Sequence, residues 1–186
     1  MEVPPLPSGH KSEKIQAMHE TLPQEKEAIF RHAFEMARRE GFQVTASDAS
    51  RPWGGFLVLD EAQAPRFAER YFAEIPLEEI VTGRKLSPKF LVVAPGQRLS
   101  WQYHFRRAEL WKVLEGPVAV AISDTDQQGE PGIYPAGEVI RLRQGERHRL
   151  IGLDTWGIVA EIWQHSDAAH PSDEDDIVRL QDDYGR

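Results

Sequence analysis

The second half of the chain consists of short apolar segments separated by turn residues. Between residues 88 and 163 there are seven such segments: KFLVVA, LSWQYHF, ELWKVLEG, VAVAIS, EVIRL, HRLIGL and GIVAEIW. Stretches rich in Gly, Pro, Asp and Gln, such as APGQ and DTDQQGEPG, lie between them, and no pattern of helical length interrupts the series. Closely spaced short strands of this kind predict an all-β sandwich or barrel.

Helical patterns are confined to the first half of the chain. In residues 24–40, Ile29, Ala33 and Met36 recur at helical spacing, and Gly41 follows as a natural stop. The preceding residues 1–20 are first Pro-rich and then polar. They predict an extended arm that contains only a short helical piece.

A second helix is expected over residues 61–74. Asp60 is a suitable N-cap, Pro65 falls in the first turn, and Pro76 ends the pattern. We therefore predict a mainly β domain at 51–186, with a helical insertion near 60–75 and an acidic C-terminal tail. The tail is either a packed turn of helix or a solvated segment. Residues 1–50 form the preceding arm and helix.

Composition narrows the possible functions. The chain has 186 residues, with 22 Lys and Arg against 30 Asp and Glu, a formal net charge of −8, and no Cys. The absence of Cys excludes disulfides, zinc–thiolate sites and cysteine nucleophiles. The acidic balance argues against nucleic acid as a partner. No apolar run is long enough to span a membrane and the N-terminus does not resemble a secretory signal, so we expect a cytoplasmic protein.

Charge is unevenly distributed along the chain. Basic residues dominate residues 84–112 and 141–149, whereas Asp and Glu dominate the C-terminal tail. A basic middle in an acidic protein could steer a small anion inward. Alternatively, the basic residues form solvated strand faces that the acidic tail balances.

Two segments carry side chains at spacings that suit a metal site. They contain Gly96, Gln102, His104, Glu109 and Gly116, and then Gly137, Arg143, Gly145 and His148. Residues two apart in a strand share a face, so Gln102 and His104 point the same way, with Arg106 continuing the row. A turn after Arg106 would bring Glu109 back beside them, and His148 begins another strand. Three or four nitrogen and oxygen ligands would then converge in an open metal site.

This spacing resembles the two signature motifs of the cupin superfamily, with Gln102 in place of the first His and Arg143 in place of a Pro. The resemblance implies a double-stranded β-helix, or jelly-roll barrel. Further segments are similar to the type II phosphomannose isomerase cupin domain: RPWGGF at 51–56, Lys89, APGQRLSWQYH, RAELW, HRL and EDDIVRLQDDYGR. In bacteria that domain often follows a mannose-1-phosphate guanylyltransferase domain. No such segment is present in this sequence, so we expect a stand-alone relative.

The resemblance assigns Gln102, His104, Glu109 and His148 as ligands of one divalent metal ion. Two imidazoles and two oxygens suit zinc, and manganese, iron, cobalt or nickel remain alternatives. The implied activity is aldose–ketose isomerisation of a sugar phosphate through an enediolate, with mannose 6-phosphate as the family's substrate. Lys89 and Glu161 are the candidates for the general base.

Substrate binding has its own candidates and alternatives. Arg98, Arg106 and Arg149 could hold a phosphate, because arginine matches it bidentately. Arg106 replaces a family His, which leaves open an isomerase of a pentose or heptose phosphate. A non-catalytic sugar-binding cupin is the alternative from another class. We expect a small-molecule sugar or sugar phosphate as the ligand, no membrane partner, and a homodimer.

Overall fold

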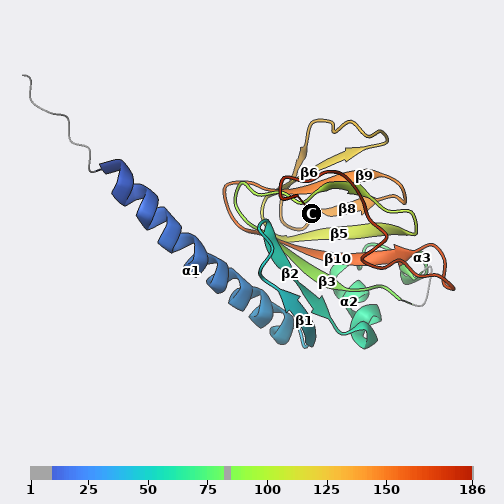
Figure 1. Cartoon of the computed structure of the whole chain (residues 1–186). Coiled ribbons are helices and arrows are strands. Elements are labelled where there is room, and N and C mark those ends of the chain that lie inside the picture. Colours follow the sequence, from blue (N-terminus) through green and yellow to red (C-terminus); the bar gives the residue numbers. More distant parts are fainter. Residues whose placement is uncertain (1–9, 82–84, 186) are drawn as a thin grey trace, which may run out of the picture.

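The computed structural model describes residues 10–81 and 85–185, with side chains from residue 24 onward. All the helices of the described residues lie in the first half of the chain (Figure 1). Its elements are α1 (His10–Arg39), β1 (Val44–Asp48), β2 (Gly54–Leu59), a 3-10 turn η1 (Glu61–Gln63), α2 (Ala64–Tyr71) and α3 (Leu77–Ile80). Strands follow: β3 (Lys89–Val93), β4 (Trp101–Tyr103), β5 (Arg107–Glu115), β6 (Val118–Ser123), β7 (Gly132–Tyr134), β8 (Val139–Leu142), β9 (Arg147–Gly152), β10 (Gly157–His165) and β11 (Val178–Gln181).

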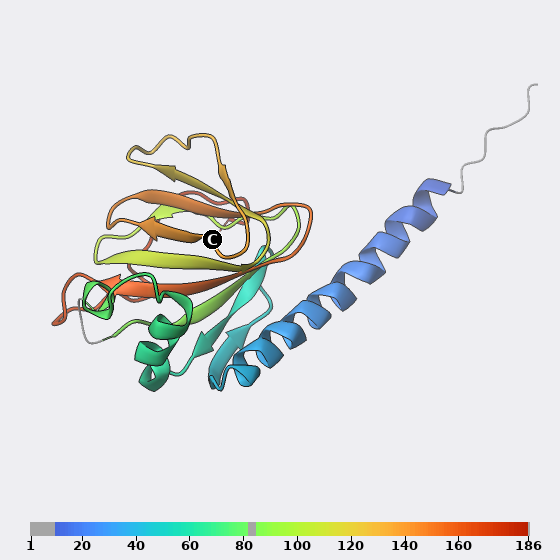
Figure 2. The ribbon, with the colours of Figure 1, turned by 180° about the vertical axis from the view of Figure 1, so that it is seen from behind.

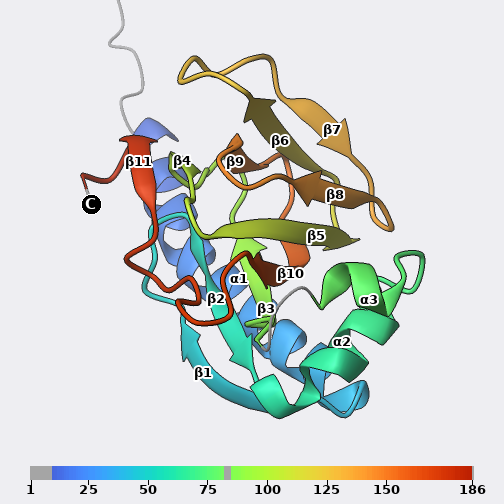
Figure 3. The ribbon, with the colours of Figure 1, turned by 90° about the vertical axis from the view of Figure 1, so that its right-hand side faces the viewer.

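The strands form two antiparallel sheets that face each other as a barrel (Figures 1 and 3). One sheet has the order β1-β2-β3-β10-β5-β8 and the other β11-β4-β9-β6-β7. Side chains from both sheets meet inside, where Leu91, Trp111 and Val159 pack with Val120 and Leu150. The predicted all-β barrel is therefore confirmed.

Helices cover the outer face of the larger sheet (Figure 2). The C-terminal half of α1 and the whole of α2 bury aromatic and small side chains against this face, among them Phe30, Ala33 and Phe67. Successive residues of a strand point to opposite faces. The central strands therefore carry apolar side chains on both faces, and β3 and β10 are almost entirely buried. The N-terminal half of α1 extends away from the barrel (Figure 1).

The structure contains all seven strands expected between residues 88 and 163, together with β1, β2, β7 and β11, which were not expected. The expected helix over 61–74 is present as η1 and α2, and Asp60 caps η1 by accepting a hydrogen bond from the Ala62 backbone. The short helix α3 follows after Pro76.

Two expectations for the chain ends need correction. Helix α1 begins at His10 and not near residue 24, so much of the expected arm is helical. Residues 1–9 lie outside the described part. The acidic tail is not a helical turn, because β11 pairs with β4 and extends the smaller sheet, although most of the side chains of the tail are exposed. We call residues 166–185 the strap. Figure 3 shows that the strap crosses one end of the barrel between β10 and β11.

No helix among the described residues combines the length and the apolar character that a membrane span requires.

Candidate metal centre

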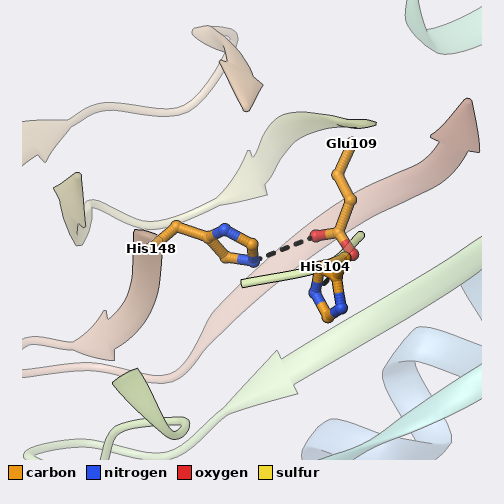
Figure 4. Close-up of side chains that lie close together, drawn as sticks. All are labelled: His104, Glu109 and His148. Carbon is orange, nitrogen blue, oxygen red and sulfur yellow. Dashed lines mark ion pairs between the residues drawn. The ribbon is translucent and has the colours of Figure 1, made fainter. Parts of the chain in front are cut away.

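Three side chains converge inside the barrel at the end that the strap crosses. His104, Glu109 and His148 each offer a ligand atom, and these atoms all lie within 4.8 Å of one another. Each of the three residues is only 2% exposed. Figure 4 shows that the His148 ring and the Glu109 carboxylate point toward each other, with His104 beside them.

Strand register explains why these residues meet. Gln102 on β4 lies opposite His148 on β9. His104 directly follows β4, where its carbonyl accepts a hydrogen bond from Gly145 of the turn that precedes His148. Glu109 lies on β5 of the facing sheet and points inward by the alternation of strand side chains. The two sheets thus contribute ligands from opposite walls.

Backbone carbonyls fix the tautomers of both histidines. His104 donates from Nδ1 to the carbonyl of Asp176 at 2.6 Å, and His148 donates from Nδ1 to the carbonyl of Glu146 at 2.9 Å. Each ring therefore carries its lone pair on Nε2. His148 Nε2 has no hydrogen-bond partner among the described residues, whereas His104 Nε2 accepts a hydrogen bond from Arg107 Nη2 at 3.1 Å. This arrangement, in which the remote ring nitrogen binds a backbone oxygen, is the usual way in which proteins orient ligand histidines.

Two of the converging atoms are buried without a hydrogen bond. Within the described part of the chain, neither Glu109 Oε2 nor His148 Nε2 has a hydrogen-bond partner, although they lie only 3.4 Å apart. Orphaned buried acceptors cost free energy unless something satisfies them. Two imidazole nitrogens and a carboxylate are a donor set that binds divalent metals. The residues present therefore fit a metal ion.

The protonation states also suit metal binding, because ligands must be deprotonated. Burial lowers the pKa of His104 to about 4. Burial alone would raise the pKa of Glu109, but His104, Arg107 and His148 together hold it well below its usual range. At neutral pH the centre thus offers a neutral imidazole at His104 and a carboxylate at Glu109.

Gln102, the fourth expected ligand, lies beside the other three, but its amide has other contacts. Its Oε1 accepts a hydrogen bond from Ser100 Oγ at 2.5 Å, and its Nε2 lies 3.4 Å from His104 Nε2. The structure therefore brings all four expected ligands together, with the amide oxygen of Gln102 directed at Ser100.

A cavity of about 100 Å³ adjoins the centre. Gln102 and Glu109 form part of its wall, and so do both candidates for the general base, Lys89 and Glu161. The other lining residues are Arg51, Trp53, Phe56, Leu91, Leu99, Arg107, Trp111, Trp163, Glu174, Ile177 and Arg179.

Lys89 and Glu161 face each other across neighbouring strands, since they are register partners in β3 and β10. Lys89 Nζ donates to Glu174 Oε1 at 2.8 Å and lies 3.6 Å from the centroid of the Trp163 ring. Glu161 Oε1 accepts a hydrogen bond from Trp111 Nε1 at 3.1 Å. Burial, together with the charge of Glu109, raises the pKa of Glu161 to about 7.

The three arginines expected to bind phosphate do not line the cavity. Each is instead bound to the strap: Arg98 to Asp183, Arg106 to Asp173, and the buried Arg149 to the carbonyl of Gln181.

Other charged residues take their place at the cavity wall: Arg51, Arg107, Glu174 and Arg179. Two of them, Arg51 and Arg107, could have been predicted from the sequence. Arg51 opens the RPWGGF segment, and Arg107 lies two residues before Glu109 and therefore shares its strand face. Arg179 and Glu174 could not be placed, because their position depends on the path of the strap.

Comparison with known proteins agrees with the fold. The model of the family described as mannose-6-phosphate isomerase C-terminal matches residues 76–182. A mannose-1-phosphate guanylyltransferase of Salmonella montevideo is 30% identical over 143 residues, which cover 77% of this chain and 24% of the relative. The alginate biosynthesis protein AlgA of Pseudomonas aeruginosa is 31% identical over 139 residues, 73% of this chain and 22% of that protein.

The chain thus spans less than a quarter of the length of these two relatives. Among solved structures, a Cupin 2 conserved barrel domain protein from Salinispora arenicola is 26% identical, with a TM-score of 0.38, over 45% of this chain and 65% of that one. The two facing antiparallel sheets and the matched family model together confirm the expected cupin barrel with its N-terminal helix. The chain belongs to the family of the mannose-6-phosphate isomerase C-terminal domain.

Proposed function

We propose that the protein is a metal-dependent isomerase that interconverts an aldose phosphate and a ketose phosphate, with mannose 6-phosphate and fructose 6-phosphate as the pair suggested by the family's name. One observation carries this proposal. Glu109 Oε2 and His148 Nε2 lack a hydrogen-bond partner among the described residues, and Glu109 lines a cavity whose wall also holds a buried carboxyl group, Glu161, and a buried ammonium group, Lys89.

Aldose–ketose isomerisation moves a proton between two adjacent carbon atoms while negative charge develops on oxygen. His104, Glu109 and His148 would hold a divalent metal ion, for which zinc is our first choice, with Gln102 beside them. When bound, such an ion supplies Lewis-acid stabilisation of that negative charge. Side chains of the cavity would transfer the proton and orient the substrate.

Glu161 is the better candidate for the base that moves the proton. A general base works best when its pKa lies near the working pH, and the pKa of Glu161 is raised to about 7 by burial and by the charge of Glu109. The Trp111 indole holds Glu161 Oε1, which leaves Oε2 to take and return the proton.

Lys89 suits a different role. Its ammonium group is held by the Glu174 carboxylate and by the face of the Trp163 ring. Both contacts are typical of a cationic side chain that is held in place. We therefore assign Lys89 to the stabilisation of a substrate oxygen or phosphate.

Exchange of the substrate C2 proton tests the proposal directly. Protein loaded with zinc, and separately with manganese or cobalt, should exchange the C2 proton of mannose 6-phosphate with solvent deuterium, as followed by NMR. The Glu161→Gln variant should lose this exchange and keep its metal, whereas Glu138→Gln, at an exposed position, should behave as the wild type. Absence of exchange across hexose, pentose and heptose phosphates would favour a sugar-binding protein without turnover. Exchange with only a pentose or heptose phosphate would reassign the substrate.

A further inference from the structure

The wall of the cavity carries an excess of cationic side chains. Arg51, Lys89, Arg107 and Arg179 line it together with three acids, Glu109, Glu161 and Glu174. An enzyme for an uncharged sugar has no need of four cations around so small a space. The four cations therefore point to an anionic ligand.

Arg107 is already committed to other partners. Its guanidinium donates to Glu109 Oε1 at 2.7 Å and to Ser172 Oγ at 2.7 Å. It also lies 3.6 Å from the centroid of the Trp163 ring. These contacts make Arg107 a fixed part of the barrel wall, so the remaining cations are the ones available to a ligand.

Among the described residues, none binds the Arg179 guanidinium. It lies on β11 opposite Gln102 of β4, which directs it to the end of the barrel where the metal centre lies. Across residues 10–81 and 85–185, the structure gives its side chain neither a hydrogen bond nor an ion pair. Arg51 is partly engaged. Its Nε lies 2.8 Å from Asp48 Oδ2, yet this buried nitrogen makes no hydrogen bond within the described residues.

Glu174 of the strap occupies the space among these cations. Its side chain is 79% exposed, yet its carboxylate reaches the Lys89 ammonium, which is only 9% exposed. Desolvation of the carboxylate where it meets Lys89 would by itself raise the pKa of Glu174, but the charges of Lys89, Arg107 and Arg51 hold it below its usual range. The carboxylate thus lies where the positive charge of the wall is concentrated.

We propose that Arg51, Lys89 and Arg179 form a binding subsite for a phosphate monoester, and that Glu174 fills this subsite until the ligand displaces its carboxylate. The inference rests on the proposed function for the identity of the ligand as a sugar phosphate. In this proposal the phosphate does not bind Arg98, Arg106 or Arg149, which the sequence suggested, because those three arginines bind the strap.

Cavity volumes support displacement of Glu174. Ligand sites for small molecules usually enclose ~300–1,000 Å³, so the inner cavity of about 100 Å³ is too small by itself. An outer groove of about 480 Å³ lies next to it and shares Lys89, Trp163 and Glu174 with it. Lys89, Trp163 and Glu174 thus lie at the boundary between the two spaces, where displacement of the Glu174 carboxylate would give the ligand more room.

Glu174 can move without loss of the rest of the strap. The strap is anchored independently by the Asp176 carboxylate, which accepts hydrogen bonds from the backbone of Phe105 and Arg106. The pairing of β11 with β4 anchors its other end. A change at Glu174 should therefore alter anion binding without unfolding this segment.

Titration of inorganic phosphate by calorimetry, at constant ionic strength, tests the subsite. We expect Glu174→Gln to tighten phosphate binding about tenfold, because an internal competing charge is removed, and Arg179→Gln to weaken it about tenfold. Asp175→Asn removes the same charge one residue away, from a side chain that does not line the cavity, and should change the affinity less than twofold.

The proposal is overturned if Glu174→Gln leaves the affinity unchanged, or if Asp175→Asn matches its effect, since the latter would indicate only a change in overall charge. The same titrations on chelator-treated protein address the metal. In the chelator-treated protein, the ratio of the phosphate affinities of Glu174→Gln and wild type should persist. The subsite is overturned if chelator treatment abolishes phosphate binding and if Arg179→Gln does not change the affinity of the metal-loaded protein. Those two results together would place the anion on the metal. Phosphate binding that follows our expectation without any C2 proton exchange would reject the isomerase and keep the subsite.

Discussion

The backbone carbonyl of Asp176 accepts a hydrogen bond from His104 Nδ1 at 2.6 Å, across 72 positions of sequence. The side chain of the same residue accepts hydrogen bonds from the backbone nitrogens of Phe105 and Arg106, at 3.0 and 2.9 Å. Asp176 therefore holds the loop after β4 from two directions. The strap orients one of the proposed metal ligands, although it provides no ligand itself.

Replacement of Asp176 should weaken both the fold and the metal site. In Asp176→Ala the two backbone nitrogens lose a charged acceptor, which should lower the free energy of unfolding by about 2–3 kcal/mol. The carbonyl that orients His104 should also be less well fixed, and loss of such support typically weakens metal binding about 10–100-fold. Urea denaturation and competitive metal titration measure the two effects.

Asp175→Asn is the matched control for Asp176, since it alters an exposed acid next to it. Its free energy of unfolding should stay within about 0.5 kcal/mol of the wild type. Equal metal affinity in Asp176→Ala and the wild type would show that the strap does not support His104.

Glu109→Gln should remove the metal. The amide cannot supply the negative charge that the two imidazoles lack, so the metal content after dialysis should fall at least tenfold, an estimate that follows from the need for a deprotonated ligand. Elemental analysis of wild type and variant, dialysed side by side, measures this. Glu138→Gln, which changes an exposed acid outside the barrel interior, is the control. Unchanged metal content in Glu109→Gln would refute the assignment of this ligand.

Local patterns in the sequence are sufficient to predict most of the barrel. Apolar segments with turn residues between them located all seven strands between residues 88 and 163, since a strand buried on both faces is marked by its own residues. Gln102, His104, Glu109 and His148 lie on or next to strands that are neighbours or face each other, so their spacing in the sequence was enough to predict that they meet. The structure brings these four residues together.

Elements that depend on distant partners could not be predicted in this way. β7 is only three residues long and mostly exposed, and β11 is a largely exposed segment that becomes a strand because the edge of β4 is available to it. The N-terminal part of α1, before residue 24, was also not expected to be continuous with the helix, because Pro23 lies inside it and a proline usually ends or kinks a helix.

The arginines illustrate a further limit. The sequence suggested that Arg106 continues the inward row of Gln102 and His104, with a turn after it. The chain instead bends at Phe105 and Arg106, directly after His104, so β5 begins at Arg107. Arg107 therefore takes the inward position in phase with Glu109, and Arg106 turns toward Asp173 of the strap.

Acid should destabilise the protein through His165. Burial, followed by the charges of Lys85, Arg107 and Arg106, lowers the pKa of this histidine from 6.5 to about 4. The His165 ring accepts a hydrogen bond at Nδ1 from the Ser172 backbone at 2.9 Å, which favours the neutral ring. Between pH 6.5 and 4 the unfolded chain therefore binds a proton that the folded chain does not. The free energy of unfolding should be fully retained above pH 6.5 and decrease as the pH falls toward 4.

Denaturant titrations at several pH values, on chelator-treated protein, measure this dependence. His104 contributes in the same direction, because its pKa is also lowered to about 4. His165→Asn should therefore reduce the slope of unfolding free energy against pH without abolishing it. A slope equal to that of the wild type would show that His165 does not carry the effect.

Gly54→Ala should disrupt the sheet that carries Lys89. Gly54 begins β2 with φ +136°, and a Cβ there would lie 1.9 Å from the carbonyl oxygen of Val92 on β3. Because the obstacle is backbone, β2 would have to move away from β3, at a cost of about 3–5 kcal/mol in the free energy of unfolding. Gly96→Ala is the control, since Gly96 also has a positive φ, +67°, but its Cβ would meet nothing within 4 Å. That variant should lose only about 1–2 kcal/mol, the ordinary cost of a left-handed alanine. Chemical denaturation distinguishes the two, and equal losses would show that the close approach of β2 to β3 is not what requires glycine at position 54.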